Sequence, residues 1–216
     1  MNNKKTVLFD LDGTITDSKM GITKSAQYAL AQYGIKVDNL DELEKFIGPP
    51  LADSFKEFYG FSNEKAIEAV EHYRVYYKEK GLYDNILYPM VEDMLIELKA
   101  CGKTLVIATS KPTVFAKKIL DHYDISKYFV DIVGSNLDGT RNAKDEVIMH
   151  ALSNLDDVKL DSVVMIGDRE HDLIGAQKNN IEAIGVTYGF GSYDELKEHN
   201  PAYIVNSVDE LMKILR

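Results

Sequence analysis

Two carboxylates near the start of the chain have a spacing that suits a cation. A short apolar run, Thr6 to Phe9, is followed directly by Asp10-Leu11-Asp12-Gly13-Thr14. Carboxylates this close together repel each other unless positive charge lies between them, and hard divalent cations prefer such oxygen ligands. Turn formation is the alternative explanation, because aspartate is favoured in turns.

Three further groups of polar residues occur later in the chain. They are Thr109-Ser110-Lys111, Lys144, and Gly167-Asp168 followed by Asp172. Each group has an ordinary structural explanation. Threonine and serine cap helices, aspartate after glycine forms turns, and a single lysine is usually a solvated surface group.

Strands and helices alternate through most of the chain and predict where these groups lie. We expect strands at 6–9, 103–108, 128–133, 162–166 and 183–186, and helices at 91–100, 114–123, 143–152, 173–179 and 208–215. Such alternation predicts an α/β fold with a doubly wound parallel sheet, covered by helices on both faces. Ligands bind such sheets beyond the carboxyl ends of the strands, where the polar groups are expected to converge.

The segment 16–84 interrupts this alternation and predicts a small α-helical domain inserted after the first strand. Its apolar residues recur at helical spacing in two stripes. One stripe is Ile22, Ala26, Leu30 and Tyr33, and the other is Ala66, Ile67, Val70, Tyr73 and Tyr77. We therefore divide the chain into a sheet domain, 1–15 with 85–216, and a helical cap, 16–84. Gly48-Pro49-Pro50 predicts a rigid loop inside the cap.

Composition excludes several classes of protein. The formal net charge of the 216 residues is -10, whereas a nucleic-acid-binding surface would be basic. No apolar run reaches the roughly 18 residues that a membrane span requires. Met1 to Lys5 contains no apolar signal sequence, and the single cysteine, Cys101, has no partner for a disulfide. We expect a cytoplasmic protein that binds neither membrane nor nucleic-acid polymer.

Taken together, the polar groups resemble the four motifs of the haloacid dehalogenase superfamily. The motifs are DLDGT at Asp10 to Thr14, then Thr109-Ser110, then Lys144, and finally GDREHD at Gly167 to Asp172. The resemblance covers essentially the whole chain, including a helical cap inserted after the first motif. It implies a Rossmann-like core with its active site at the carboxyl ends of the strands.

The resemblance also implies roles for the acidic residues. Asp10 would be the nucleophile that attacks phosphorus and forms an aspartyl-phosphate. Asp12 would protonate the leaving alcohol and then activate water. Mg²⁺ would be held by Asp10, the backbone carbonyl of Asp12 and Asp168, with Asp172 assisting.

Phosphate binding and reaction type follow from the same resemblance. Thr109, Ser110 and Lys144 would bind the phosphate oxygens. Dehalogenases of the superfamily lack the second aspartate of the first motif, which has no leaving alcohol to protonate there. Because Asp12 is present, phosphoryl transfer to water is the favoured reaction.

The resemblance defines the substrate less closely than it defines the reaction. A helical cap suits small phosphomonoesters, and related caps use a loop near Gly48, Pro49 and Pro50 to select them. Within the superfamily the chain resembles phosphoglycolate phosphatases, and the stretches Ile47 to Leu51 and Gly134 to Arg141 resemble those of bacterial 5'-nucleotidases.

Several alternatives stay open from the sequence. A phosphosugar mutase of the β-phosphoglucomutase type shares the nucleophile and the cap, and a binding protein could keep the fold without turnover. The run His72 to Tyr77 could be a base-stacking surface, although helical core packing explains it better. The roles of Arg74, Arg141 and Arg169 and the oligomeric state are also open, and a monomer is compatible with the sequence.

Overall fold

The computed structural model describes Met1 and residues 3–216, which form two compact units. The larger unit, which we call the core unit, comprises Met1–Asp17 and Leu87–Arg216. The smaller unit, the cap unit, comprises Ser18–Ile86 and enters the chain between the first and second strands of the main sheet. The predicted α/β fold with an inserted helical segment is therefore confirmed.

The core unit contains a six-stranded parallel sheet in the order β5-β4-β1-β6-β7-β8. Its strands are β1 (Thr6–Phe9), β4 (Thr104–Pro112), β5 (Asp131–Ser135), β6 (Val163–Gly167), β7 (Glu182–Val186) and β8 (Tyr203–Val205). Two further strands, β2 (Thr16–Asp17) and β3 (Ile86–Leu87), form a separate two-stranded sheet. Because β1 lies between β4 and β6, the chain reverses its direction of winding there, at the switch point where doubly wound folds bind ligands.

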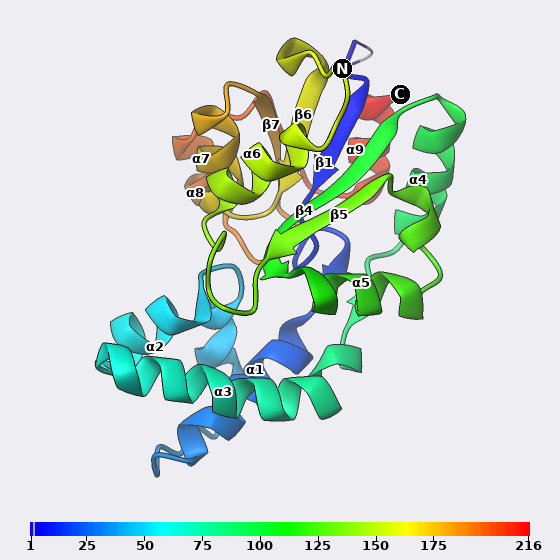
Figure 1. Cartoon of the computed structure of the whole chain (residues 1–216). Helices are drawn as coiled ribbons and strands as arrows, with labels where there is room; N and C mark the ends of the chain where they lie inside the picture. Colours follow the sequence, from blue (N-terminus) through cyan, green and yellow to red (C-terminus); the bar gives the residue numbers. More distant parts are fainter. Residues whose placement is uncertain (2) are drawn as a thin grey trace. The chain divides into compact units, whose positions relative to one another are not determined.

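Helices cover both faces of this sheet (Figure 1). They are α4 (Val91–Ala100), α5 (Thr113–His122), α6 (Lys144–Ser153), α7 (Glu170–Lys178), α8 (Tyr193–Glu198) and α9 (Val208–Leu215). Short 3-10 turns occur at Ser126–Tyr128 and Leu160–Ser162 in the core unit and at Gly81–Tyr83 in the cap unit. Leu8 and Met165 of the sheet pack with Val147 of α6 and Leu173 of α7 in one buried cluster. Helix α4 packs against α9. Burial on both faces explains why the strands are continuously apolar.

Several details of the core unit differ from the sequence prediction. The strand predicted at 128–133 lies at Asp131–Ser135, because Ser126–Tyr128 forms a 3-10 turn. Helix α8 and strand β8 were missed, because six and three residues are too short to show periodicity. Helix α7 begins at Glu170 rather than Leu173, so Asp172 lies in its first turn. Strand β4 continues to Pro112, with its pairing to β5 shifted between Ala108 and Pro112.

The cap unit is helical, as the apolar stripes predict. It contains α1 (Lys19–Ala31), a 3-10 helix (Leu40–Phe46), α2 (Leu51–Tyr59) and α3 (Asn63–Glu79). Tyr73 and Tyr77 are buried and stack on each other with ring centroids 5.4 Å apart, so this part of the tyrosine-rich run packs the cap interior. Ile67 was wrongly assigned to the buried stripe, since 62% of its surface is exposed.

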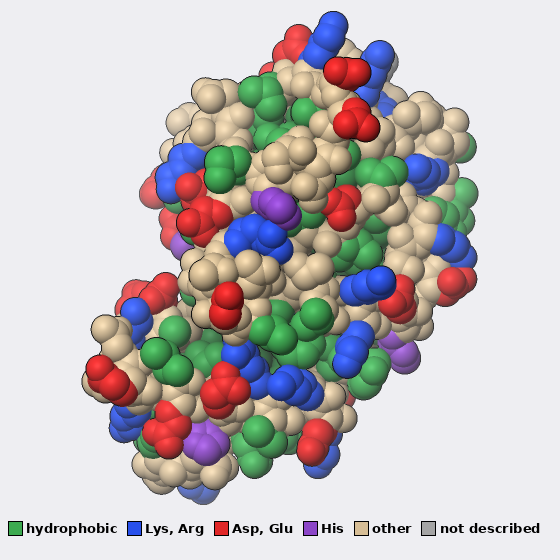
Figure 2. All heavy atoms as spheres, in the orientation of Figure 1, with side chains coloured by type: hydrophobic (Ala, Val, Ile, Leu, Met, Phe, Trp, Pro, Cys, Tyr) green, Lys and Arg blue, Asp and Glu red, His purple; other side chains and the backbone are tan. Residues whose placement is uncertain are grey.

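The surface carries both signs of charge. Lysine and arginine side chains are interspersed with aspartate and glutamate over the face drawn in Figure 2. Within the described part of the chain, no helix combines the length and the apolar character that crossing a membrane requires. The cytoplasmic location stays a prediction.

Candidate active site

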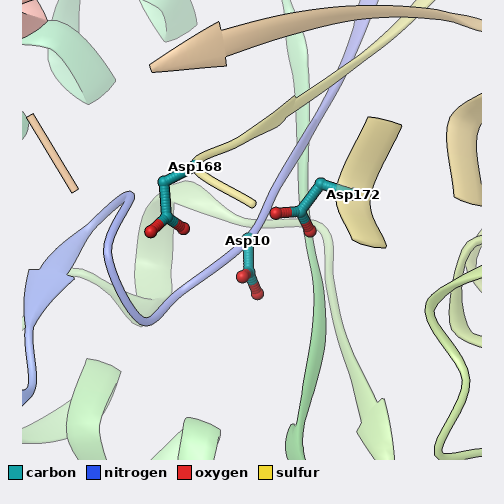
Figure 3. A group of neighbouring side chains, drawn as sticks. All are labelled: Asp10, Asp168 and Asp172. Atoms are coloured by element: carbon teal, nitrogen blue, oxygen red, sulfur yellow. The ribbon is translucent and has the colours of Figure 1, made fainter. Parts of the chain in front are cut away.

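Three buried carboxylates meet at the carboxyl edge of the sheet (Figure 3). Asp10 follows the last residue of β1, Asp168 follows the last residue of β6, and Asp172 lies in the first turn of α7. One oxygen from each lies within 4.8 Å of the others, and all three residues are buried. Parallel strand ends thus bring together acids that are up to 162 residues apart in sequence. We call this group the acidic triad.

The acidic triad is electrostatically strained. Burial, followed by repulsion from Asp172 and Asp10, raises the pKa of Asp168 well above its usual value. Burial also raises the pKa of Asp172, to about 6, against the opposing attraction of Lys144. Both shifts have the direction expected when anions are confined away from water without enough positive charge.

Lys144 supplies one positive charge to the triad. It is the first residue of α6, and its Nζ lies 2.8 Å from Asp10 Oδ1 and 2.7 Å from Asp172 Oδ1. It also donates a hydrogen bond to the backbone oxygen of Ala108. Burial lowers the pKa of Lys144, but the attraction of Asp10 and Asp172 outweighs burial and raises it, so the amine is protonated. The ammonium of Lys144 thus contacts two of the three carboxylates.

The residues of the triad fit a divalent cation. Oδ1 of Asp10 and Oδ1 of Asp172 are buried and are ion-paired with Lys144, yet neither accepts an aligned hydrogen bond in the described chain. Gly13 has φ +83°, and a Cβ there would lie 2.1 Å from Asp168 Oδ2. Oxygen ligands with unused lone pairs, excess negative charge and backbone free of side chains suit Mg²⁺ or a similar hard cation.

Asp12 occupies a different position from the triad. Its carboxylate pairs with Lys111, with Oδ2 and Nζ 2.9 Å apart. A cation contact from its backbone carbonyl stays a prediction. Sequence reasoning placed Lys111 beside the second motif but gave it no role. Nothing in the spacing of residues 12 and 111 indicated that the two would pair.

The second motif lies in the irregular part of β4. Thr109 is buried, and its Oγ1 accepts a hydrogen bond from the Lys111 backbone nitrogen at 3.3 Å. The Ser110 backbone oxygen accepts from Ser135 Oγ at 2.8 Å. The shifted pairing with β5 acts as a β-bulge, a feature that commonly redirects side chains beside active sites.

A loop after β7 completes the site and was missed from the sequence. The Phe190 backbone nitrogen donates to Asp168 Oδ2 at 2.8 Å, and the Tyr188 hydroxyl donates to the Thr14 backbone oxygen at 3.1 Å. At Gly189, a Cβ would lie 2.2 Å from the Gly13 oxygen. Two glycines flanking Phe190 directly after an apolar strand were the available signal.

The arginines left open have defined contacts. Arg169 pairs with Glu195 at 2.8 Å, and Arg74 pairs with Glu71 inside α3 at 2.6 Å. Arg141 donates to the Gly134 oxygen and to Asn136 Oδ1, so it orders its own loop. Gly48, Pro49 and Pro50 lie in the cap unit, where their expected role in substrate selection stays a prediction.

Comparison with known proteins agrees with this geometry. The chain is 47% identical over 209 residues to a 5'-nucleotidase of Pseudomonas aeruginosa, an alignment that covers 97% of this chain and 94% of the relative. It is 36% identical to the tyrosine-protein kinase PtkA of Mycobacterium tuberculosis, covering 97% of this chain and 72% of that protein. A phosphoglycolate phosphatase of Vibrio parahaemolyticus is more distant, at 27% identity over 98% of this chain and 96% of the relative.

A solved structure and a family model extend the agreement. The crystal structure of a predicted phosphatase from Clostridium acetobutylicum is 54% identical, covers 98% of both chains and superimposes with a TM-score of 0.96. The model of the haloacid dehalogenase-like hydrolases matches residues 7–186, which include every motif residue of the core unit described above. The chain belongs to the haloacid dehalogenase-like hydrolases.

Proposed function

We propose that the protein is a Mg²⁺-dependent phosphatase that hydrolyses small phosphomonoesters through an aspartyl-phosphate. The observation that carries the proposal is the acidic triad of Asp10, Asp168 and Asp172, two of whose members, Asp10 and Asp172, pair with Lys144. Membership of the hydrolase family supports a phosphatase. The proposal assigns one role to each group of the site.

In the first half of the reaction, an oxygen of Asp10 forms a bond to phosphorus as the bond from phosphorus to the alcohol oxygen breaks. Asp12 gives its proton to that alcohol oxygen. Lys144 and the Thr109-Ser110 segment bind the phosphate oxygens and hold phosphorus in line with Asp10. Asp10, Asp168 and the Asp12 backbone carbonyl would hold Mg²⁺ with the assistance of Asp172, and the cation would supply positive charge that screens the nucleophile from the phosphate.

In the second half, water hydrolyses the aspartyl-phosphate. Asp12, now ionised, takes a proton from water as the water oxygen forms its bond to phosphorus. The bond from Asp10 to phosphorus breaks, and inorganic phosphate leaves. One residue therefore serves as acid and then as base, which returns the enzyme to its starting protonation state.

Nucleoside 5'-monophosphates are the substrates we propose first. The relative at 47% identity is a 5'-nucleotidase, whereas the phosphoglycolate phosphatase is only 27% identical. 2-Phosphoglycolate is the second candidate. We propose that the Gly48-Pro49-Pro50 loop of the cap unit contributes to the choice between them.

The test is phosphate release from a panel of nucleoside monophosphates, phosphoglycolate and sugar phosphates with Mg²⁺, with Asp10→Asn as the blank. Preference for one nucleotide over the other esters supports the nucleotidase. Preference for phosphoglycolate overturns the substrate but keeps the chemistry. An isomerised phosphosugar without net phosphate release would indicate a mutase, and no reaction with any ester would favour a binding protein.

A further inference from the structure

Lys111 and Asp12 form an ion pair that the proposed reaction does not by itself require. The Lys111 Nζ lies 2.9 Å from Asp12 Oδ2, and only 5% and 11% of the two side chains are exposed. Both residues belong to the core unit. Removing two charges from water is costly, so a buried pair is weak evidence for stability and invites a functional explanation.

The two oxygens of Asp12 are in different situations. Oδ2 contacts Lys111, whereas Oδ1 is buried and has no hydrogen-bond partner among the described residues. A buried carboxylate oxygen without a partner is unfavourable unless another group uses it. The pair therefore anchors one oxygen and leaves the other available.

The backbone of Asp12 is fixed independently of Lys111. Ile15 and Thr16 donate backbone hydrogen bonds to the Leu11 oxygen at 2.9 Å, and Gly13 donates to the Thr16 oxygen at 2.8 Å. With the backbone held by this turn, the remaining freedom of Asp12 is rotation of its side chain. Contact with Lys111 selects one rotamer.

Lys111 is itself well placed to act as a fixed anchor. It lies in the bulged part of β4, and its backbone nitrogen donates to Thr109 Oγ1. Lys144 contacts Asp10 and Asp172, while Lys111 contacts Asp12. The two buried lysines thus pair with different carboxylates.

We propose that Lys111 is a positioning residue that holds Oδ2 of Asp12 and thereby directs Oδ1 to the proton transfers. This inference rests on the proposed phosphatase activity. When Asp12 is protonated, Oδ2 stays on the Lys111 ammonium and Oδ1 carries the proton, which it gives to the leaving alcohol in the first half of the reaction. In the second half, the same oxygen takes a proton from water. A carboxylate free to rotate would spend less time in reach of either proton.

The experiment compares Lys111→Met, which keeps much of the side-chain length without the charge, with Lys111→Arg, which keeps the charge. For a nucleoside monophosphate, whose alcohol needs a proton, we expect kcat of Lys111→Met to fall about 10²-fold, the scale of general acid–base catalysis. KM should change less than about threefold, and Lys111→Arg should restore most of kcat.

p-Nitrophenyl phosphate separates the two halves, because its leaving group needs no proton. With Lys111→Met, rapid mixing should give a burst of p-nitrophenol equal to the enzyme concentration. Slow turnover should follow, because water activation is impaired. Aspartyl-phosphate should accumulate in acid-quenched samples.

Lys103→Met is the matched control. Lys103 is another buried lysine of the core unit, and its Nζ donates to the Lys4 backbone oxygen at 2.6 Å. Its replacement should lower thermal stability without a burst or a dependence on the leaving group. If Lys111→Met does not fold, Lys111→Gln takes its place in the same assays.

Two results would overturn the inference while leaving the phosphatase intact. One is a raised KM with unchanged kcat, which would make Lys111 a substrate ligand. The other is an equal loss of rate for both leaving groups without a burst. A wild-type protein that releases no phosphate from any ester would overturn the proposed function as well.

Discussion

Asp10 is the residue at which chemistry and folding can be separated most cleanly. Replacement by asparagine keeps the size of the side chain and removes one of three mutually repelling charges. We expect Asp10→Asn to lose at least roughly 10³-fold in turnover, because a nucleophile acts as part of a unit with its acid and base. Its melting temperature without metal should change little, since the relief of repulsion offsets the lost pairing of Asp10 with Lys144.

Phosphate release and thermal unfolding measure the two effects on the same samples. Asp156→Asn, which removes an exposed acid, is the control for nonspecific loss of charge. Turnover within tenfold of wild type in Asp10→Asn would show that another group attacks phosphorus.

Gly13 combines two requirements that can be tested apart. Its φ of +83° disfavours any side chain, and a Cβ would also meet Asp168 Oδ2. Gly102 has φ +75° but no atom within 4 Å of an added Cβ. We expect Gly102→Ala to lose about 1 kcal/mol of stability, the usual cost of left-handed backbone. Gly13→Ala should lose a similar amount of stability, and it should also bind Mg²⁺ more weakly.

Mg²⁺ titration followed by thermal shift distinguishes the two alanine variants. Equal Mg²⁺ affinity in both variants would mean that Asp168 can move away from the added Cβ without weakening Mg²⁺ binding. In that case the close approach of Gly13 would not contribute to the cation site.

At the scale of elements, α8 acts as a brace for the start of α7. Glu195 Oε1 accepts from Arg169 Nε at 2.8 Å and from the Glu170 backbone nitrogen at 2.9 Å. The Arg169 backbone nitrogen in turn donates to Asp172 Oδ2 at 3.1 Å. Burial opposes ionisation of Glu195, but the hydrogen bond from Arg169 prevails and lowers its pKa. An ionised Glu195 thus fixes the turn that carries Asp172.

Removing this brace should loosen the cation site from a distance. We expect Glu195→Gln to weaken Mg²⁺ binding about tenfold, the lower end of what residues behind metal ligands contribute. Asp194→Asn changes an exposed acid one residue earlier in the same short helix and should bind Mg²⁺ normally. If both variants bind equally, Asp172 does not depend on α8 for its position.

The arrangement of strands and helices also explains which site residues could be predicted from the sequence. Asp10 and Asp168 were found because each directly follows a strand, and parallel strand ends share one edge. The Lys111–Asp12 pair was not found, because it depends on a bulge that exists only when β4 pairs with β5. Glu195 was missed because its helix has six residues, too few for a periodic pattern.

At the scale of the whole molecule, the net charge of -10 and the acidic triad both oppose the binding of an anionic substrate. The chain as a whole repels anions, so an anionic substrate depends on the local positive charge of the site. Lys144 and Lys111 are both buried beside carboxylates. A bound divalent cation would add positive charge to the site and would strengthen its attraction for an anionic substrate.

Stability without metal should therefore depend on pH in an unusual direction. The raised pKa values of Asp172, about 6, and Asp168 mean that the folded protein binds their protons more tightly than the unfolded chain does. The triad therefore favours the folded state below about pH 4, the ordinary carboxyl range. This contribution is lost as pH rises through about 6.

Thermal unfolding in EDTA between pH 4 and 7 measures this loss, with Asp172→Asn as the reference that lacks the shifted group. The melting temperature of wild type should fall relative to that of the variant as pH rises. Mg²⁺ binds the ionised carboxylates, so it should stabilise wild type most near pH 7, by about 2.7 kcal/mol at a hundredfold excess over its Kd. Parallel curves in EDTA, together with no stabilisation by Mg²⁺ at either pH, would mean that the triad is neutralised within the protein and needs no cation.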